Sequence, residues 1–202
     1  MLEMLGYDKA LLMFINGFAG HWVWLDEAMI FVSRYGPLLF AACLAGMWFS
    51  GDTAEATEQN RRQALYAFAA ALLALGINQL VGGVWFRDRP YVHNRVHRLL
   101  PMTPDASFPS DHAAGAFAIA GSAARGRPIS GGLLAALAVI VAISRVYVGL
   151  HYPSDVLGGM LIGLISSRIV ERKRALLERP VTWLLAMWNA IEAKIAVLPP
   201  SR

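Results

Sequence analysis

The sequence contains few charged residues and a single cysteine. Asp, Glu, Lys and Arg make up only 16% of its 202 residues, whereas about 25% is typical of soluble domains. Hydrophobic residues make up 56%, which leaves too little polar surface to coat a water-soluble globule. Because Cys43 is the only cysteine, an intramolecular disulfide and a cysteine-rich metal site are both excluded. The composition therefore argues against an ordinary cytosolic enzyme and against a disordered protein.

Basic residues outnumber acidic ones, which gives a formal net charge of +4 and a pI near 9.5. This balance is compatible with nucleic-acid binding, but in so hydrophobic a chain it is better explained by basic loops beside anionic lipid. We therefore expect membrane lipids and an anionic substrate as partners, and no nucleic acid. The oligomeric state cannot be read from the sequence.

Apolar runs of membrane-spanning length recur along the chain. Residues 63–86 and 128–144 carry no formal charge, and about 20 apolar residues are enough to cross a bilayer core. Three further runs lie at residues 33–51, 111–124 and 152–167. The sequence thus predicts an all-α, polytopic membrane helix bundle with five spans, and with six as the alternative. Three glycines in the last run are spaced for close helix contact: Gly158, Gly159 and Gly163.

The two ends of the chain are apolar but interrupted by charge. Residues 2–18 and 181–198 are therefore predicted to form amphipathic helices that lie in the membrane interface. We treat residues 1–202 as one membrane-embedded domain. Its parts are an interfacial helix at 1–20, a core at 60–170 and a cytoplasmic or interfacial tail at 171–202.

The loops on the two sides of the expected bundle differ in charge. One side contains Arg61, Arg62, Arg125, Arg127, Arg168, Arg172, Lys173, Arg174 and Arg179. The loop at residues 87–110 and the turn at 151 lie on the other side, together with the N-terminal helix. The positive-inside rule places the first side in the cytoplasm. We expect the N-terminus outside, the C-terminus inside and any site at residues 87–110 on the extracytoplasmic face.

Polar residues gather at four helix ends on this outer side. They are Arg89, Ser110, Asp111, His112, Arg145, His151 and Asp155. Two apolar helices there begin after Pro and Ser, at residues 108–112 and 152–155. The free N–H groups of such helix starts bind phosphate, arginine forks match phosphate oxygens, and histidine moves protons or attacks phosphorus. The pattern predicts a phosphoryl-transfer site that requires no metal and no cofactor.

These residues resemble the type 2 phosphatidic acid phosphatase superfamily. Ser144-Arg145, five residues, His151, three residues and Asp155 match its third signature. The second signature, Pro-Ser-Gly-His, is similar to residues 109–112, and the end of the first, Arg-Pro, is similar to Arg89-Pro90. The resemblance covers about residues 60–170. It implies an all-helical lipid phosphatase.

Two departures from the signatures narrow the resemblance. Gly82 stands where the first signature has Lys, and Asp111 stands where the second has Gly. These two departures, taken together with residues 105–112 and Val92-His93, resemble the bacitracin-resistance type of undecaprenyl-diphosphate phosphatase, which lies in bacterial plasma membranes. The implied reaction releases inorganic phosphate and undecaprenyl phosphate, which recycles the carrier of cell-wall precursors and confers bacitracin resistance.

The resemblance also implies a role for each residue of the site. His151 attacks the terminal phosphorus, and Asp155 holds the other ring nitrogen of His151 and so fixes its tautomer. His112 protonates the leaving group and later activates water. The phosphate oxygens are held by Arg89, Arg145, Ser110 and the backbone N–H groups of Asp111 and His112. Arg87 is predicted to supply the positive charge that the missing Lys would bring, and the alternative is that Arg87 pairs with an Asp. Arg95 and Arg98, in the same loop, could also reach the phosphate.

Other interpretations remain open at this stage. The enzyme alternative is a broad lipid phosphatase acting on phosphatidic acid, diacylglycerol diphosphate or phosphatidylglycerol phosphate. The non-enzyme alternative is a lipid-phosphate binder or flippase, although a binder needs no nucleophile. Asn78 and Gln79, inside a span, are interpreted as interhelical hydrogen-bonding residues.

Overall fold

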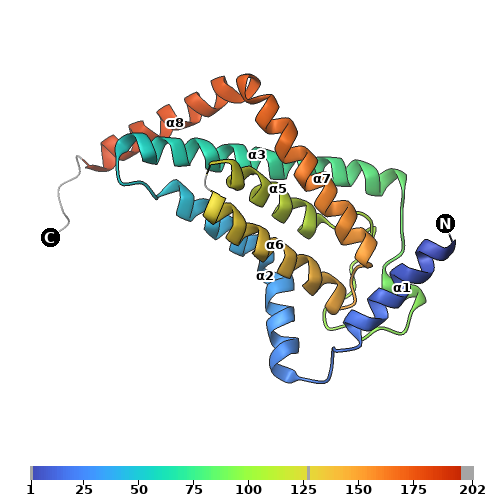
Figure 1. Cartoon of the computed structure of the whole chain (residues 1–202). Helices are drawn as coiled ribbons and strands as arrows, with labels where there is room; N and C mark the ends of the chain where they lie inside the picture. Colours follow the sequence, from blue (N-terminus) through green and yellow to red (C-terminus); the bar gives the residue numbers. More distant parts are fainter. Residues whose placement is uncertain (1, 127, 197–202) are drawn as a thin grey trace.

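The computed structural model describes residues 2–126 and 128–196, and every regular element within these ranges is a helix. The helices are α1 (Leu2–Asn16), α2 (Val23–Trp48), α3 (Ala54–Val84), α4 (Pro90–His93), α5 (Asp111–Gly126), α6 (Pro128–Tyr147), α7 (Pro153–Arg172) and α8 (Arg174–Ala196). The predicted all-α membrane bundle is confirmed (Figure 1).

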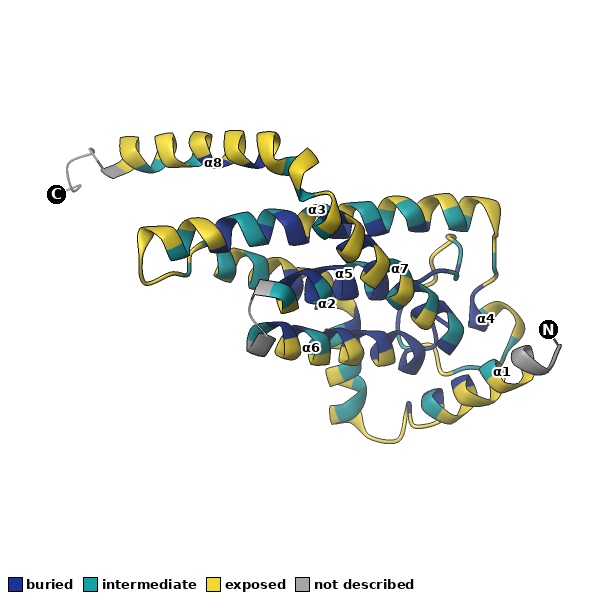
Figure 2. Cartoon of the chain, turned by 45° about the horizontal axis from the view of Figure 1, so that its top comes forward, coloured by how far each residue is buried: buried dark blue, intermediate teal, exposed yellow. Residues whose placement is uncertain are grey.

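Helix α5 occupies the middle of the bundle. It packs against α3, α6 and α7 and is the most continuously buried of the helices in view (Figure 2). Its core positions are small, since Ala113, Ala114 and Ala118 are completely buried. Small side chains let the neighbouring backbones approach closely, which is how helices associate within a membrane.

Glycines of α7 make two of these close approaches. A Cβ atom at Gly159 would collide with the backbone carbonyl of Ser110, and one at Gly163 would collide with the carbonyl of Ala114. The contact expected from the glycine spacing is therefore present between α7 and α5. Because the contact includes Ser110, it also sets the distance between the starts of these two helices.

Four helices are long and apolar enough to cross a membrane: α2, α3, α6 and α7. Each overlaps one of the predicted runs, and α2 and α3 begin and end earlier than expected. The start of α3 is explained by Thr53, whose side chain accepts a hydrogen bond from the N–H of Ala56 at 3.1 Å. The fifth expected span, 111–124, corresponds to α5, which has only 16 residues and is enclosed by longer helices.

Helices α1 and α8 flank the bundle at opposite ends (Figure 1). At one end, the side-chain amide of Asn16 in α1 donates to the carbonyl of Tyr147, 2.7 Å away. At the other, α8 is tied to α3 by ion pairs between Arg61 and Glu192 and between Arg62 and Glu178. The predicted C-terminal helix is present but begins at Arg174, and the last residues of its expected range lie outside the described residues.

Candidate active site

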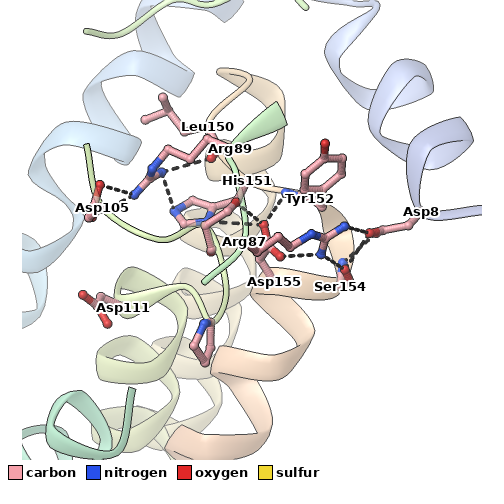
Figure 3. A network of polar contacts seen from close by, with 12 residues as sticks. Asp8, Arg87, Arg89, Asp105, Asp111, Leu150, His151, Tyr152, Ser154 and Asp155 are labelled. Carbon is pink, nitrogen blue, oxygen red and sulfur yellow. Dashed lines mark hydrogen bonds and ion pairs between the residues drawn. The ribbon is translucent and has the colours of Figure 1, made fainter. Parts of the chain in front are cut away.

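The predicted site residues come together where α5 and α7 begin and α6 ends. The N–H of Ser110, just before α5, donates to the carbonyl of Asp155 in the first turn of α7, 3.0 Å away. This bond joins the two helix starts that the sequence singled out. The loop between α6 and α7 carries His151 into the same region, and Arg89 enters it from the start of α4 (Figure 3).

His151 is buried, and its two ring nitrogens have different partners. Nδ1 lies 2.8 Å from the carbonyl oxygen of Ser107, while Nε2 lies 3.1 Å from the Nη1 atom of Arg89. A carbonyl oxygen only accepts, so the ring proton belongs on Nδ1. Nε2 then carries the lone pair, which accepts a hydrogen bond from Arg89 in this structure. This is the tautomer that a nucleophilic histidine requires.

Asp155 is fully buried beside His151. Its Oδ2 atom accepts hydrogen bonds from the backbone N–H of Tyr152 at 2.8 Å and from the hydroxyl of Ser107. Its Oδ1 atom accepts from Arg87. The distance from Oδ2 to His151 Nδ1 is 3.6 Å, too long for a hydrogen bond. The direct bond expected between Asp155 and His151 is therefore replaced by the Ser107 carbonyl, and Asp155 acts on the ring through its charge.

Burial lowers the pKa of His151 to about 4, and the positive charges of Arg145 and Arg89 act in the same direction. The carboxylate of Asp155 opposes this effect and favours the protonated ring. At neutral pH His151 is consequently uncharged, which is the protonation state that a nucleophile needs.

Arg89 is almost fully buried, and its guanidinium is held from several sides. Nη1 donates to the carbonyl of Leu150 at 3.0 Å, and Nη2 lies 3.0 Å from both carboxylate oxygens of Asp105. Partial burial acts to raise the pKa of Asp105, but hydrogen bonds from Thr103 and Arg89 outweigh it and hold that pKa below its ordinary value. An ionised carboxylate therefore covers one side of Arg89 in this structure.

Arg145 projects from the last turn of α6 toward α2. Its Nη1 atom donates to the hydroxyl of Ser33 at 2.7 Å and to the carbonyl of Ser33 at 3.2 Å. That carbonyl would normally bond to the N–H four residues later, but this position is Pro37, which has no N–H. The proline thus leaves a free acceptor inside a membrane helix, and the buried guanidinium uses it.

Three buried donors in this region have no acceptor among the described residues. They are the Nε atoms of Arg89 and Arg145 and the hydroxyl of Ser110. A buried donor without a partner is costly, so such groups commonly await a ligand. All three belong to residues that the sequence assigned to phosphate binding.

His112 is the second residue of α5, partly buried. The charged or titratable groups that act on it are Arg145, His151, Arg89 and Asp105. The structure therefore brings both histidines and both arginines into one cluster.

Asp111 is turned away from this cluster. Its carboxylate accepts hydrogen bonds from Asn78 at 2.9 Å and from Gln79 at 3.1 Å, which confirms the interhelical role predicted for those two side chains. Only its backbone N–H, at the start of α5, is placed for phosphate. On the same side, a Cβ atom at Gly82 would lie 3.5 Å from the carbonyl of Phe108, so the position of the missing Lys faces the loop that leads into α5.

Arg87 lies on the far side of Asp155 from Arg89 (Figure 3). Its terminal nitrogens donate to Asp155 and Ser154, both at 2.6 Å, and to Asp8 at 2.7 Å. Its guanidinium also stacks over the ring of Tyr152 at 3.9 Å. Of the two possibilities left by the sequence, the geometry matches pairing with an Asp and not direct contact with phosphate.

Sequence reasoning missed three residues of the site: Ser33, Ser107 and Asp8. A proline four residues after a serine inside a span was the available signal for Ser33. Ser107 was visible only as part of a signature-like run, and nothing in the sequence linked Asp8 to residues about 80 to 150 positions away. Among the described residues, no three His, Cys, Asp or Glu side chains are grouped to hold a metal ion; the unpaired donors are suited to an anion.

Comparison with known families gives a match that covers the site. The model described as "PAP2 superfamily" matches residues 63–176, which contain every residue predicted for catalysis or phosphate binding. Among curated proteins, the chain is 37% identical to undecaprenyl-diphosphatase BcrC from Bacillus subtilis over 186 residues, which is 92% of this chain and 93% of the relative.

Two solved structures share the fold. A crystal structure of LpxE from Aquifex aeolicus superposes with a TM-score of 0.67 at 24% identity, covering 81% of this chain and 94% of that one. The first transmembrane PAP2 type phosphatidylglycerolphosphate phosphatase from Bacillus subtilis gives a TM-score of 0.66 at 23% identity, covering 88% and 89% of the two chains.

Proposed function

The chain belongs to the PAP2 superfamily, and from this membership we propose that it hydrolyses undecaprenyl diphosphate to undecaprenyl phosphate and inorganic phosphate. The observation that carries the proposal is the group of buried, unpaired donors on Arg89, Arg145 and Ser110 beside the neutral Nε2 of His151. The substrate class is suggested by the similarity to the Bacillus subtilis undecaprenyl-diphosphatase.

In the first step, Nε2 of His151 attacks the terminal phosphorus. An N–P bond forms while the bond from that phosphorus to the bridging oxygen breaks, and the electron pair of the broken bond stays on undecaprenyl phosphate. His112 gives a proton to this leaving oxygen. His151 keeps the phosphoryl group as phosphohistidine, and its Nδ1 proton stays hydrogen-bonded to Ser107.

In the second step, water hydrolyses the phosphohistidine. His112, now deprotonated, takes a proton from the attacking water, and the N–P electron pair returns to His151. Arg89, Arg145, Ser110 and the N–H groups at the start of α5 stabilise the charge on the equatorial oxygens in both steps. Asp155 stabilises the positive charge that develops on His151.

We assign the site to the extracytoplasmic face of a bacterial plasma membrane. The support is the excess of arginine on the opposite loops. On that face the enzyme recycles the lipid carrier of cell-wall precursors and confers bacitracin resistance by removing the diphosphate. Residues 60–170 form the catalytic core in this proposal, while α1 and α8 lie in the two interfaces.

The test is hydrolysis by the purified protein in detergent. Undecaprenyl diphosphate, phosphatidic acid, diacylglycerol diphosphate and phosphatidylglycerol phosphate are compared at matched concentrations, with His151→Ala as the inactive control. We expect the highest kcat/KM on undecaprenyl diphosphate. A higher kcat/KM on one of the phospholipids would make that phospholipid the preferred substrate. Binding without phosphate release would make the protein a lipid-phosphate binder.

A further inference from the structure

We propose that Asp8 and Arg87 are positioning residues for the reaction, and that the N-terminal helix α1 acts through them on the charge and orientation of Asp155 beside the nucleophile. The contact that carries the inference is the chain Asp8, Arg87, Asp155, His151. The inference rests on the proposed function, because it takes His151 as the nucleophile.

Arg87 joins α1 to the catalytic carboxylate. One terminal nitrogen donates to Asp155 at 2.6 Å, and the other donates to Asp8 at 2.7 Å. The side chains of Asp155 and Asp8 have exposed fractions of 0% and 9%, and that of Arg87 has 20%. Ion pairs this shielded from water are screened little, so each charge acts on the next.

Asp8 also caps the helix that carries Asp155. Its Oδ1 atom accepts from the backbone N–H of Ser154 at 2.9 Å, and its Oδ2 atom accepts from the Ser154 hydroxyl at 2.6 Å. Ser154 lies in the first turn of α7, where free N–H groups favour a negative charge. A single carboxylate from α1 therefore fixes both Arg87 and the start of α7.

The signs of the charges predict opposite effects for the two residues. The positive charge of Arg87 partly cancels the negative charge of Asp155, so Asp155 stabilises a protonated His151 less. The negative charge of Asp8 partly cancels that of Arg87, so Asp155 again stabilises the protonated ring more strongly. Removing the charge of Asp8 should therefore make His151 harder to protonate, and removing Arg87 should make it easier.

Several other groups face His151 and must be constant across the variants. They are Arg89 from the start of α4, Asp105 through Arg89, His112 from α5, Arg145 from α6 and Asp155 from α7. None of them is changed in the variants proposed below. The ionisation of the substrate is also the same in every variant.

The experiment measures kcat, KM and the acid limb of the pH profile of kcat/KM for undecaprenyl diphosphate, with purified full-length protein in detergent. The variants are Asp8→Asn, Arg87→Gln and Arg87→Lys. Glu27→Gln, which neutralises an exposed carboxylate in α2, is the matched control. Inhibition by orthovanadate reports phosphate binding separately, and thermal unfolding reports whether each variant is folded.

We expect kcat to fall about ten-fold in Arg87→Gln and several-fold in Asp8→Asn, with KM and the vanadate inhibition constant within about two-fold of wild type. The acid limb should move to lower pH in Asp8→Asn and to higher pH in Arg87→Gln, by about half a unit to one unit in each case. Arg87→Lys keeps the charge and should return the limb close to its wild-type position.

Four results would overturn the inference. A weaker vanadate affinity in Arg87→Gln would make Arg87 a phosphate ligand. A loss of kcat with the limb unmoved, or variants that no longer fold, including Arg87→Lys, would leave these contacts with a purely structural role. Wild-type kcat in both charge-removing variants would show that the contacts do not matter. Absence of activity in the wild-type protein would instead reject the proposed function itself.

Discussion

Asp105 accepts two hydrogen bonds from one nitrogen of Arg89, each 3.0 Å long, and so places a carboxylate where a phosphate is expected to bind. The side chain of Asp105 is 59% exposed, whereas that of Arg89 is 5% exposed. The pair therefore joins a surface loop to the buried cation of the site. A substrate phosphate must displace this carboxylate to reach Arg89.

Asp105→Asn should consequently strengthen the binding of phosphate analogues. An ion pair whose carboxylate is exposed contributes about 0.5–1 kcal/mol, so we expect the inhibition constant of orthovanadate to fall about two- to five-fold. Asp88→Asn is the control, because Asp88 is an exposed carboxylate that pairs with His93 and not with Arg89. Unchanged or weaker inhibition in Asp105→Asn would show that Asp105 does not compete with phosphate.

Substitution of His151 and of His112 should reduce hydrolysis in different ways. His151→Ala should abolish hydrolysis of both diphosphates and phosphate monoesters, because no covalent intermediate forms. His112→Ala should reduce monoester hydrolysis more than diphosphate hydrolysis, since a monoester expels an alkoxide that needs a proton. Rapid quenching with substrate labelled on the terminal phosphate measures both reactions and the enzyme-bound label.

Trapped label is the sharper part of this comparison. It should be absent from His151→Ala and present in His112→Ala if water activation slows more than phosphorylation. Label bound to His151→Ala, or equal losses on the two substrate classes in His112→Ala, would reverse or reject the assigned roles.

Ser33 and Pro37 should matter through Arg145, although neither is near the signature residues in sequence. Ser33→Ala removes one acceptor of a buried guanidinium, and Pro37→Ala returns an N–H that competes for the Ser33 carbonyl. Loss of such a charged hydrogen bond lowers the free energy of unfolding by about 1.5–3 kcal/mol, and an Arg145 side chain that is held less firmly should bind vanadate more weakly in Ser33→Ala. The control is Ser166→Ala, which should bind vanadate normally. Ser166 is a buried serine of α7 whose hydroxyl has no hydrogen-bond partner among the described residues.

Acid should destabilise the protein through His151. Because burial lowers its pKa from 6.5 to about 4, the folded protein binds fewer protons than the unfolded chain between these values. The stability that this difference contributes is complete above about pH 6.5 and is lost as the pH falls toward 4. The melting temperature of wild type should therefore fall more steeply over this interval than that of His151→Gln. His93→Gln, at an exposed histidine, should melt with the wild-type slope.

The orientation of the protein can be tested by labelling cysteines in intact cells. Asn94 lies in the outer loop but is half-buried and donates to the hydroxyl of Tyr152, so the exposed Arg95 is the better position. Arg95→Cys in a Cys43→Ala background should react with an impermeant thiol reagent, and Asp52→Cys, in the exposed turn before α3, should react only after the membrane is broken. The reverse pattern would place the site in the cytoplasm.

The fold was predictable because its main determinants lie within short, continuous stretches of the sequence. Runs of apolar residues define the spans, and the small residues of α5 and α7 define their contact. The length of α2 was underestimated because Asp26 and Glu27 interrupt the apolar run; the structure pairs Asp26 with the hydroxyl of Tyr147 at 2.7 Å. The charged Asp26 near the start of α2 is therefore compatible with a helix that begins before it.

The site was predictable as a set of residues and less so as a set of contacts. The two histidines and the arginines 89 and 145 do lie together, as the ordered motifs implied. The partner of each depends on segments that the motifs do not contain: the Ser107 carbonyl takes the place of Asp155 at His151, and Asp8 and Asp155 take Arg87 away from phosphate. Such long-range pairings depend on how α1 and the loop before α5 pack, and composition and spacing carry no information about that packing.

The shortness of α5 is compatible with the bilayer because other helices enclose it. Sixteen residues span about 24 Å at 1.5 Å per residue, less than the roughly 30 Å of a hydrocarbon core, and a helix of this length that faced lipid would create a hydrophobic mismatch. Since α5 packs against α3, α6 and α7 and is buried along most of its length, lipid contacts the longer helices instead. The depth of His112, in the first turn of α5, is therefore set by helix packing and not by the thickness of the bilayer.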